Sequence, residues 1–158
     1  MNTSIILLVE DEPTSVFFFE HMVKKLGITN PVRIARDGRE ALDYLEGAGE
    51  FVDRQKNPMP GLVLLDLKLP RVSGFEVLQQ LRQNSETKKI VVLILSSSAS
   101  DDDIAKAYSL GAHGYLVKPL HLEELQEIVQ AIKDFWLTHN HPPPLRGGRT
   151  FFDGLRLT

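Results

Sequence analysis

The sequence predicts an α/β protein whose open parallel sheet is covered by helices on both faces. Two observations lead to this fold class. Short, largely apolar runs that resemble strands buried on both faces recur five times, at residues 5–9, 32–35, 62–65, 91–95 and 115–117. Stretches with helical spacing separate these runs, and a strand followed by a helix, five times over, is typical of a doubly wound parallel sheet.

The first helix is expected directly after the first apolar run. Pro13 suits the first turn of a helix, because its fixed backbone angle is helical and it has no N–H to leave unpaired. Apolar residues that share one helical face follow it, namely Val16, Phe19, Val23 and Leu26. Phe17, Phe18 and Met22 are apolar residues beyond this stripe. They belong either to a wider core stripe or to a docking surface for another protein.

Capping residues mark where the later helices begin. Asp37 and Ser73 are each followed three residues later by a glutamate, which is the spacing of a capping box. Ser100 precedes three consecutive aspartates, which favour a helix N-terminus. The last helix carries apolar residues with helical spacing through Trp136, but His121 stands where a serine or threonine cap is usual.

The composition excludes several classes of protein. Of the 158 residues, 42% are hydrophobic and 25% charged, which is enough apolar material for an ordinary folded core. The net charge of −3 argues against a general nucleic-acid binder. No cysteine is present, which excludes disulfides, zinc thiolates and iron–sulfur clusters. No apolar run is long enough to cross a bilayer and no basic, apolar leader opens the chain, so we expect a cytoplasmic protein without a membrane partner.

One domain accounts for most of the chain. The strand and helix pattern fills residues 1–138, and the polar segment 47–61 is its longest connection. From residue 139 on, three prolines at 142–144 and two glycines at 147–148 mark a tail that is too short for a core of its own. We therefore expect one domain at residues 1–138, a tail at residues 139–158 and no output domain.

Polar side chains stand where the predicted strands end. Glu10 and Asp11 follow the first apolar run, and Asp66 follows the third. Ser96 follows the fourth run and Lys118 the fifth. Because parallel strands place their carboxyl ends at one edge of the sheet, we expect these side chains to meet there. Carboxylates crowded together repel one another unless a cation neutralises them. Mg²⁺ prefers carboxylate oxygens and often shares a site with phosphate, so it is the expected cofactor.

This arrangement resembles the receiver domain of two-component response regulators. The resemblance covers roughly residues 4–137 and rests on separated positions in the family's order, which are Glu10-Asp11, Asp66-x-x-x-Pro70-x-x-x-Gly74, Ser96 and Lys118-Pro119. The long connection before the third strand and the aromatic end of the last helix are similar to the cyanobacterial phytochrome response regulators. The resemblance implies a flavodoxin-like (βα)5 fold with strand order 2-1-3-4-5.

The resemblance also implies a role for the residues at the sheet edge. Asp66 is the expected nucleophile, which takes a phosphoryl group from a kinase histidine and forms an aspartyl phosphate. Asp11 and Asp66 are expected to bind Mg²⁺ directly, with Glu10 acting through water and the backbone carbonyl of Lys68 as a further ligand. Lys118 is expected to pair its compact positive charge with a phosphoryl oxygen.

Two further residues are implied to form the switch. Ser96 is expected to bond another phosphoryl oxygen, and Tyr115 to turn inward as that hydroxyl moves. The bond between Lys118 and Pro119 is expected to be cis. Taken singly, each residue has a plainer interpretation, such as a helix cap for Asp66, an exposed lysine or a half-buried strand tyrosine. Taken together and in this order, they favour the switch.

The predicted function is a stand-alone response regulator that catalyses only its own phosphorylation and dephosphorylation. Its partner is expected to be a sensor histidine kinase of the phytochrome type, which docks on Ser15, Phe18 and Met22. The signal is expected to leave through the surface of the fourth helix, fifth strand and fifth helix. Phe135 and Trp136 are expected to support a homodimer, unless Trp136 folds back on its own domain. The alternative function is a phosphorelay intermediate that passes the phosphoryl group to a histidine phosphotransfer protein.

Two other classes share parts of this pattern. A haloacid-dehalogenase-like phosphatase also uses a strand-terminal aspartate with Mg²⁺, but it needs a second aspartate two residues on, where this chain has Lys68. A flavodoxin-like FMN binder needs a first loop that cradles a phosphate with hydroxyls and amides. Glu10, Asp11 and Glu12 would repel that phosphate, so charge disfavours both classes.

Overall fold

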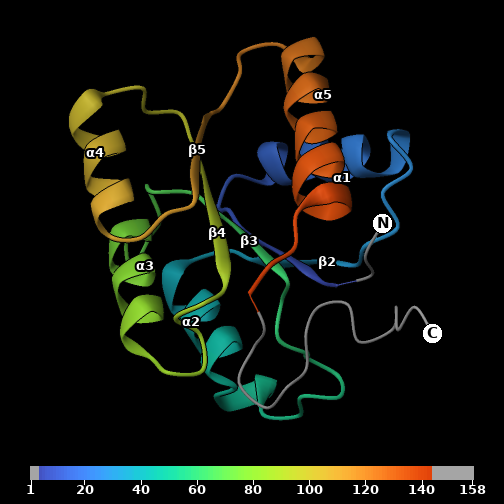
Figure 1. The fold of residues 1–158 in the computed structure, drawn as a ribbon. Helices are drawn as coiled ribbons and strands as arrows, with labels where there is room; N and C mark the ends of the chain where they lie inside the picture. Colours follow the sequence, from blue (N-terminus) through green and yellow to red (C-terminus); the bar gives the residue numbers. More distant parts are fainter. Residues whose placement is uncertain (1–3, 144–158) are drawn as a thin grey trace.

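A five-stranded parallel sheet forms the centre of the computed structural model, which describes residues 4–143 (Figure 1). Its strand order is β2-β1-β3-β4-β5, which confirms the predicted topology. The elements in chain order are β1 (Ile6–Val9), α1 (Pro13–Lys25), β2 (Val32–Ala35), α2 (Gly38–Glu46), a 3₁₀ turn (Gly49–Phe51), β3 (Leu62–Leu65), α3 (Gly74–Gln83), β4 (Val91–Ser96), α4 (Asp101–Ser109), β5 (Gly114–Val117), α5 (Leu122–Ala131) and a π-helix (Ile132–His139).

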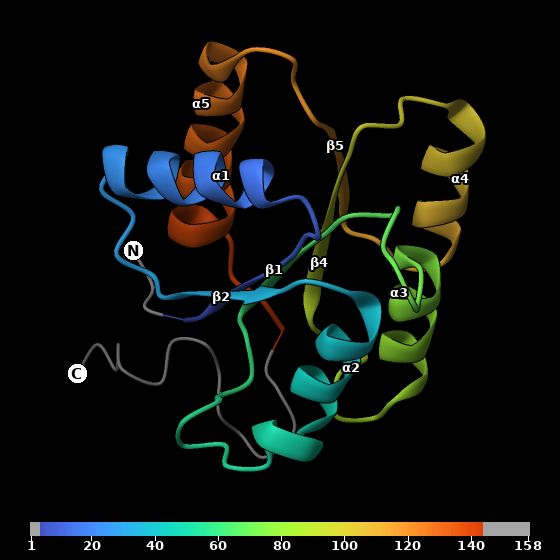
Figure 2. The ribbon, with the colours of Figure 1, turned by 180° about the vertical axis from the view of Figure 1, so that it is seen from behind.

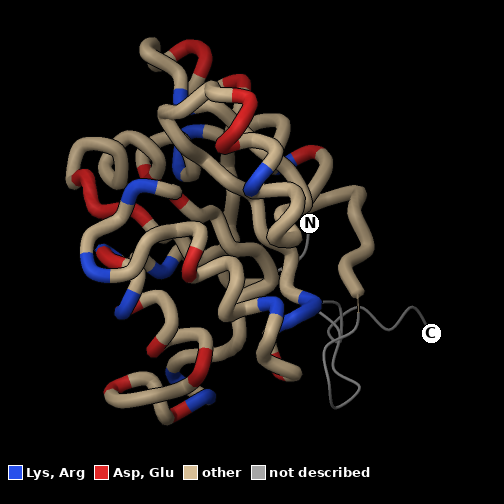
Figure 3. The backbone as a smooth tube through the Cα atoms, turned by 90° about the vertical axis from the view of Figure 1, so that its left-hand side faces the viewer, with Lys and Arg blue, Asp and Glu red and all other residues tan. Residues whose placement is uncertain are grey.

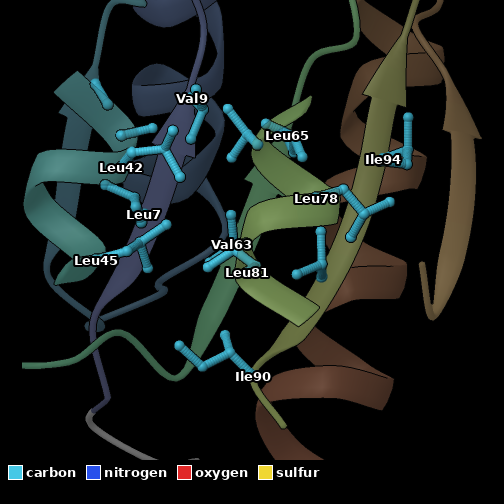
Figure 4. Packing of buried hydrophobic residues seen from close by; sticks show 14 of the residues in the cluster. Leu7, Val9, Leu42, Leu45, Val63, Leu65, Leu78, Leu81, Ile90 and Ile94 are labelled. Atoms are coloured by element: carbon cyan, nitrogen blue, oxygen red, sulfur yellow. The ribbon is translucent and has the colours of Figure 1, made fainter. Parts of the chain in front are cut away.

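The helices lie on both faces of the sheet, as Figures 1 and 2 show. Side chains alternate along each strand, so Leu7 and Val9 of β1 enter the core beneath α2 and α3, while Ile6 and Leu8 enter the core beneath α1 and α5. Figure 4 shows the first of these cores, where leucines of α2 and α3 interdigitate with the strands. Both faces of the central strands are thus dry, which explains their continuous apolar runs.

The helix starts follow the predicted caps. Ser73 and Glu76 form a complete capping box at α3. Asp37 accepts the N–H of Glu40 at 2.8 Å, and Ser100 likewise caps α4. His121 makes no capping hydrogen bond at α5, as expected from its imidazole.

Two expectations about the helices need correction. Met22 of α1 is only 3% exposed and packs in the core beneath α5, so it belongs to the wider core stripe and is not a docking residue. Val16, Phe19 and Val23 are buried as predicted. The last helix does not continue unchanged to Trp136, because the chain changes from α to π geometry at Ile132.

The long connection between α2 and β3 is held by Arg54. Its guanidinium donates hydrogen bonds to the carbonyls of Tyr44 at 2.6 Å and Leu45 at 2.7 Å, which are in the last turn of α2. The hydroxyl of Tyr44 donates in turn to the carbonyl of Pro58 at 2.8 Å. Arg54 therefore supplies donors to carbonyls that a helix end leaves without partners, and fixes the connection against α2.

Charged residues of both signs are interspersed along the described chain (Figure 3). None of the helices within residues 4–143 combines the length and the apolar character that crossing a bilayer requires. Most of the predicted tail, residues 144–158, lies outside the described part of the chain.

Candidate functional site at the carboxyl edge of the sheet

The carboxyl ends of β1 and β3 bring three acids together. Glu10 and Asp11 follow β1, and Asp66 follows the neighbouring strand β3. Each offers a carboxylate oxygen, and these oxygens all lie within 4.8 Å of one another. The acids predicted from the strand ends thus form one cluster, although they are 56 positions apart in the chain between Glu10 and Asp66.

Lys118 lies among these acids. Its ammonium donates a hydrogen bond to Asp66 Oδ2 at 2.8 Å and a second one to Glu10 Oε2. Glu10 and Asp66 are only 2% and 6% exposed, so water cannot compensate much of their charge. The ammonium from the end of β5 therefore neutralises part of the repulsion between acids from β1 and β3.

The electrostatics of the site follow from this contact. Burial raises the pKa of the Glu10 carboxyl above its ordinary value, although its bonds to Lys118 and to a backbone N–H act against that rise. Burial by itself would lower the pKa of the Lys118 ammonium, but the hydrogen bonds that it donates to Asp66 and Glu10 outweigh burial and raise this pKa. Lys118 is therefore held as a cation.

The backbone orients both buried carboxylates. Asp66 Oδ1 accepts the N–H of Lys68 at 3.3 Å, and Glu10 Oε1 accepts the N–H of Glu12 at 3.0 Å. At Gly74, the first residue of α3, a Cβ atom would lie 2.1 Å from the carbonyl oxygen of Asp66. The glycine in the Asp-x-x-x-Pro-x-x-x-Gly pattern is thus required because α3 begins in direct contact with the backbone of Asp66.

The predicted switch residues Ser96 and Tyr115 both bond the same residue, Ser98. Ser96 is fully buried at the end of β4, and its hydroxyl accepts the N–H of Ser98 at 3.2 Å. The Tyr115 hydroxyl donates to the carbonyl of Ser98 at 2.8 Å. Ser98 was not predicted as a site residue, because a serine in a loop forms no recognisable sequence pattern by itself.

The bond between Lys118 and Pro119 is trans, since no peptide bond within residues 4–143 is cis. The expectation of a cis bond is therefore wrong for this structure. For a bond before proline the trans form is ordinarily favoured, by about 0.5–1 kcal/mol.

A cavity of about 320 Å³ adjoins the acidic cluster on the side of α1 and α5. Ser15 and Phe18, two of the predicted docking residues, line it together with Lys118. Leu120, which is 94% exposed, forms part of its rim and was not predicted. The sequence feature that could have indicated Leu120 is its position, since it is an apolar residue in the short connection between β5 and α5.

Phe135 and Trp136 lie apart from this site, on the π-helix. Their rings pack edge to face with centroids 4.9 Å apart. Phe135 is 54% exposed, whereas Trp136 is half-buried and packs against the core beneath α1 and α5. The structure therefore leaves Phe135 available at the surface and partly folds Trp136 onto its own domain.

Known proteins are similar to this chain in sequence and in fold. The family model described as the response regulator receiver domain matches residues 6–130. The probable methanogenesis regulatory protein FilR2 of Methanothrix harundinacea is 42% identical over 142 residues, which cover 88% of this chain and 87% of that protein. Response regulator Rcp1 of Synechocystis is 38% identical over 84% of this chain and 88% of its own.

Solved structures agree with these sequence matches. The Mn²⁺-bound form of Rcp1 superposes with a TM-score of 0.81 and covers 89% of this chain and 99% of its own at 37% identity. The phosphorylated cyanobacterial phytochrome response regulator RcpA has a TM-score of 0.83 at 35% identity and covers 89% of this chain and 98% of its own.

Proposed function

Because the chain belongs to the response regulator receiver family of two-component signalling, we propose that Asp66 is the residue that accepts the phosphoryl group. Members of this family are phosphoacceptor switches that histidine kinases phosphorylate, and they are not enzymes in the ordinary sense. The observation that carries the proposal is the buried Asp66 carboxylate at the end of β3, bonded to Lys118 at 2.8 Å. That RcpA has been described in a phosphorylated form supports the same chemistry.

The proposed reaction is a transfer from histidine to aspartate. A carboxylate oxygen of Asp66 forms a bond to phosphorus, the phosphorus–nitrogen bond of the donor breaks, and the donor imidazole keeps the electron pair and takes up a proton. Transfer of this kind depends on position and on charge neutralisation. Lys118 supplies the charge, because its ammonium already contacts Asp66 and can pair with an oxygen of the incoming group. In a separate step, water attacks the phosphorus of the aspartyl phosphate, the bond between phosphorus and the Asp66 oxygen breaks, and inorganic phosphate and the free carboxylate are released.

The donor set fits a divalent cation. Glu10, Asp11 and Asp66 each offer one carboxylate oxygen, and these three oxygens lie within 4.8 Å of one another. They are hard ligands of the kind Mg²⁺ prefers. Asp11 and Asp66 would hold the ion directly, with Glu10 through water and the Lys68 carbonyl as a further ligand. When bound, the ion supplies positive charge opposite the phosphoryl oxygens. The Mn²⁺-bound form of Rcp1 supports this assignment.

The switch and the lifetime of the phosphorylated state are proposed to depend on nearby residues. Ser96 would bond a phosphoryl oxygen, and Tyr115 would change its position as the Ser96 hydroxyl moves. Lys68, two residues after Asp66, is exposed and offers no acceptor that could orient a hydrolytic water. The output surface is proposed to be that of α4, β5 and α5. Rcp1 and RcpA, both named as response regulators, favour this output role over the relay alternative.

The proposed partners are a histidine kinase and a second copy of the chain. Kinase docking is proposed at the cavity beside the acidic cluster, where Ser15 and Phe18 lie, and a phytochrome-type kinase is supported by the likeness to RcpA. Since such a kinase draws its phosphoryl group from ATP, the proposed location is the cytoplasm. A homodimer through Phe135 and Trp136 is supported by the exposed ring of Phe135. Sedimentation of wild type and Phe135→Ala, with and without beryllofluoride, tests it, and a monomer in every condition would overturn it.

The acceptor is tested by labelling with a small phosphodonor in the presence of Mg²⁺. We expect one base-labile phosphoryl group on the wild type and none on Asp66→Asn, because the amide is no nucleophile. Asp11→Asn should be labelled only at higher Mg²⁺. Undiminished labelling of Asp66→Asn would contradict the assignment. With a kinase as the donor, Phe18→Ala should lose transfer while it keeps small-donor labelling, whereas loss of both would place Phe18 in the core.

A further inference from the structure

We infer that Ser98 is a positioning residue that couples the acceptor site to helix α4, an inference that rests on the proposed phosphorylation of Asp66. Ser98 lies two residues beyond β4, in the connection that leads from the sheet edge to the start of α4 (Figure 1). The hydrogen bonds of Ser98 within residues 4–143 do not include one to Asp66. The importance of Ser98 comes from the residues that it joins.

Each polar group of Ser98 has a partner. Its N–H donates to the hydroxyl of Ser96 at 3.2 Å, and its carbonyl accepts from the hydroxyl of Tyr115 at 2.8 Å. Its own hydroxyl donates to Asp103 Oδ2 at 2.6 Å and accepts the N–H of Ser100 at 3.3 Å. One residue thus bonds both proposed switch side chains and the first turn of α4.

The link from the site to Ser98 follows from the bonds of Ser96. Ser96 is fully buried, and its hydroxyl is the acceptor that the structure gives to the N–H of Ser98. When the hydroxyl of Ser96 rotates toward a phosphoryl oxygen, its oxygen moves away from the N–H of Ser98. Because an N–H that loses its acceptor costs free energy, we expect the peptide of Ser98 to move with the hydroxyl.

The link from Ser98 to α4 depends on the hydroxyl of Ser98. Asp103 is half-buried, whereas Asp101 and Asp102 in the same turn are exposed. The backbone N–H of Asp103 is bonded to the Ser100 hydroxyl at 3.1 Å, and its side chain is bonded to Ser98. Since Asp103 is held at both its backbone and its carboxylate, a movement of Ser98 is transmitted to the first turn of α4. The backbone of Ser98 makes no described contact with that turn that could replace the hydroxyl.

Substitutions of Ser98 and Asp103 separate this link from the chemistry. Ser98→Ala and Asp103→Ala each remove one side of the bond between hydroxyl and carboxylate, Ser98→Thr keeps the hydroxyl, and Asp102→Ala is the matched control. The control removes the same charge from the same helix turn at an exposed position, so it reproduces any effect on the helix dipole alone. For each protein, two quantities are measured: labelling of the acceptor by a small phosphodonor, and the change in backbone amide NMR shifts on adding beryllofluoride with Mg²⁺.

We expect all variants to be labelled to the same extent as the wild type. In Ser98→Ala and in Asp103→Ala, the beryllofluoride-induced shifts should persist around residues 66 and 96, while those at residues 101–104 fall to about half or less, because the hydrogen-bonded chain is interrupted. Ser98→Thr and Asp102→Ala should respond like the wild type. Undiminished shifts at residues 101–104 in Ser98→Ala would overturn the coupling role alone. Absence of labelling in the wild type would instead overturn the proposed phosphorylation, and this inference with it.

Discussion

Two cations stand at opposite edges of the sheet, and they are bound in different ways. Lys118, at the carboxyl edge, bonds the carboxylates of Glu10 and Asp66. Arg82 of α3, at the amino edge, bonds uncharged groups, which are the carbonyls of Gly111 at 2.7 Å, Ile90 at 2.8 Å and Lys88 at 3.0 Å, and the imidazole of His113 at 3.2 Å. Burial lowers the pKa of Arg82, whereas the acids raise that of Lys118 above its ordinary value despite its burial.

The difference shows which cation can change partners. The partners of Lys118 are side chains with negative charge, and an arriving phosphoryl group offers a charge of the same sign. Lys118 can therefore exchange one partner for another without any change in the backbone. The partners of Arg82 are carbonyls of the segments that enter β4 and β5, so releasing them means displacing those segments. The same kind of charge thus serves a reaction at one edge and fixes the fold at the other.

Replacing Arg82 with methionine tests the structural side of this comparison and should have the largest effect on stability. The carbonyls of Gly111 and Ile90 would lose their donor, and leaving such groups unpaired costs about 2–3 kcal/mol in total, with some relief from water at this partly exposed position. Urea unfolding measures the loss. The fraction that remains folded should still be labelled at Asp66.

Replacing Lys118 with methionine is the matched variant at the other edge. With Mg²⁺ present, a cation can compensate the acids, so we expect a loss of stability of about 1 kcal/mol or less, together with impaired labelling or an absent response of α4 to it. The proposed difference between a reactive Lys118 and a structural Arg82 would be contradicted by one result. In that result, Lys118→Met is destabilised as strongly as Arg82→Met while its labelling and its α4 response stay normal.

The contribution of His113 to the pH dependence of stability tests the amino edge further, and it is the smallest of the expected effects. Its Nδ1 accepts the N–H of Val92 at 3.2 Å and faces the Arg82 guanidinium. Partial burial and the charge of Arg82 lower the pKa of His113 below its usual 6.5, so folding favours the neutral ring. The resulting contribution to stability is complete above the unfolded pKa and is lost as the pH falls below it.

Stability curves at pH 7.5 and pH 5.5 measure this contribution. We expect the wild type to lose more stability between these values than His113→Gln, whose side-chain oxygen can accept the same N–H without titrating. Equal losses in the two proteins would show that His113 does not contribute, and would confine the role of Arg82 to its carbonyl partners.

The carboxyl edge was largely predictable from the sequence, and the reason is local. A buried strand that ends in an acid must place that acid at the sheet edge, so Asp66 and Glu10 followed directly from the apolar runs before them. The capping roles of Ser73 and Ser100 were equally predictable, because a capping side chain accepts an N–H only three residues away. In such cases the partner is near in sequence or fixed by the strand order.

The amino edge and the surface of α1 were not predictable in the same way. Arg82 bonds a carbonyl 29 positions away, and any residue at Gly111 would present a carbonyl, so the pair leaves no pattern in the sequence. Phe18 and Met22 looked alike because both are apolar and lie on one helical face. Only the packing of α5 against α1 determines that Met22 is covered and Phe18 remains half-exposed.

The contacts of Arg54 bear on how this protein is degraded. A long surface connection is ordinarily where a protease first cuts a folded domain, and the segment between α2 and β3 has the length for it. The guanidinium of Arg54 in this segment, however, donates hydrogen bonds to the carbonyls of Tyr44 and Leu45. The Tyr44 hydroxyl also donates to the carbonyl of Pro58 in the same segment. A protease needs an extended strand of several residues, so these bonds must open before it can cut. The rate of nicking in this segment is therefore set by the free energy of that local opening, not by how much of the loop is exposed, and limited proteolysis of Arg54→Met against the wild type measures it.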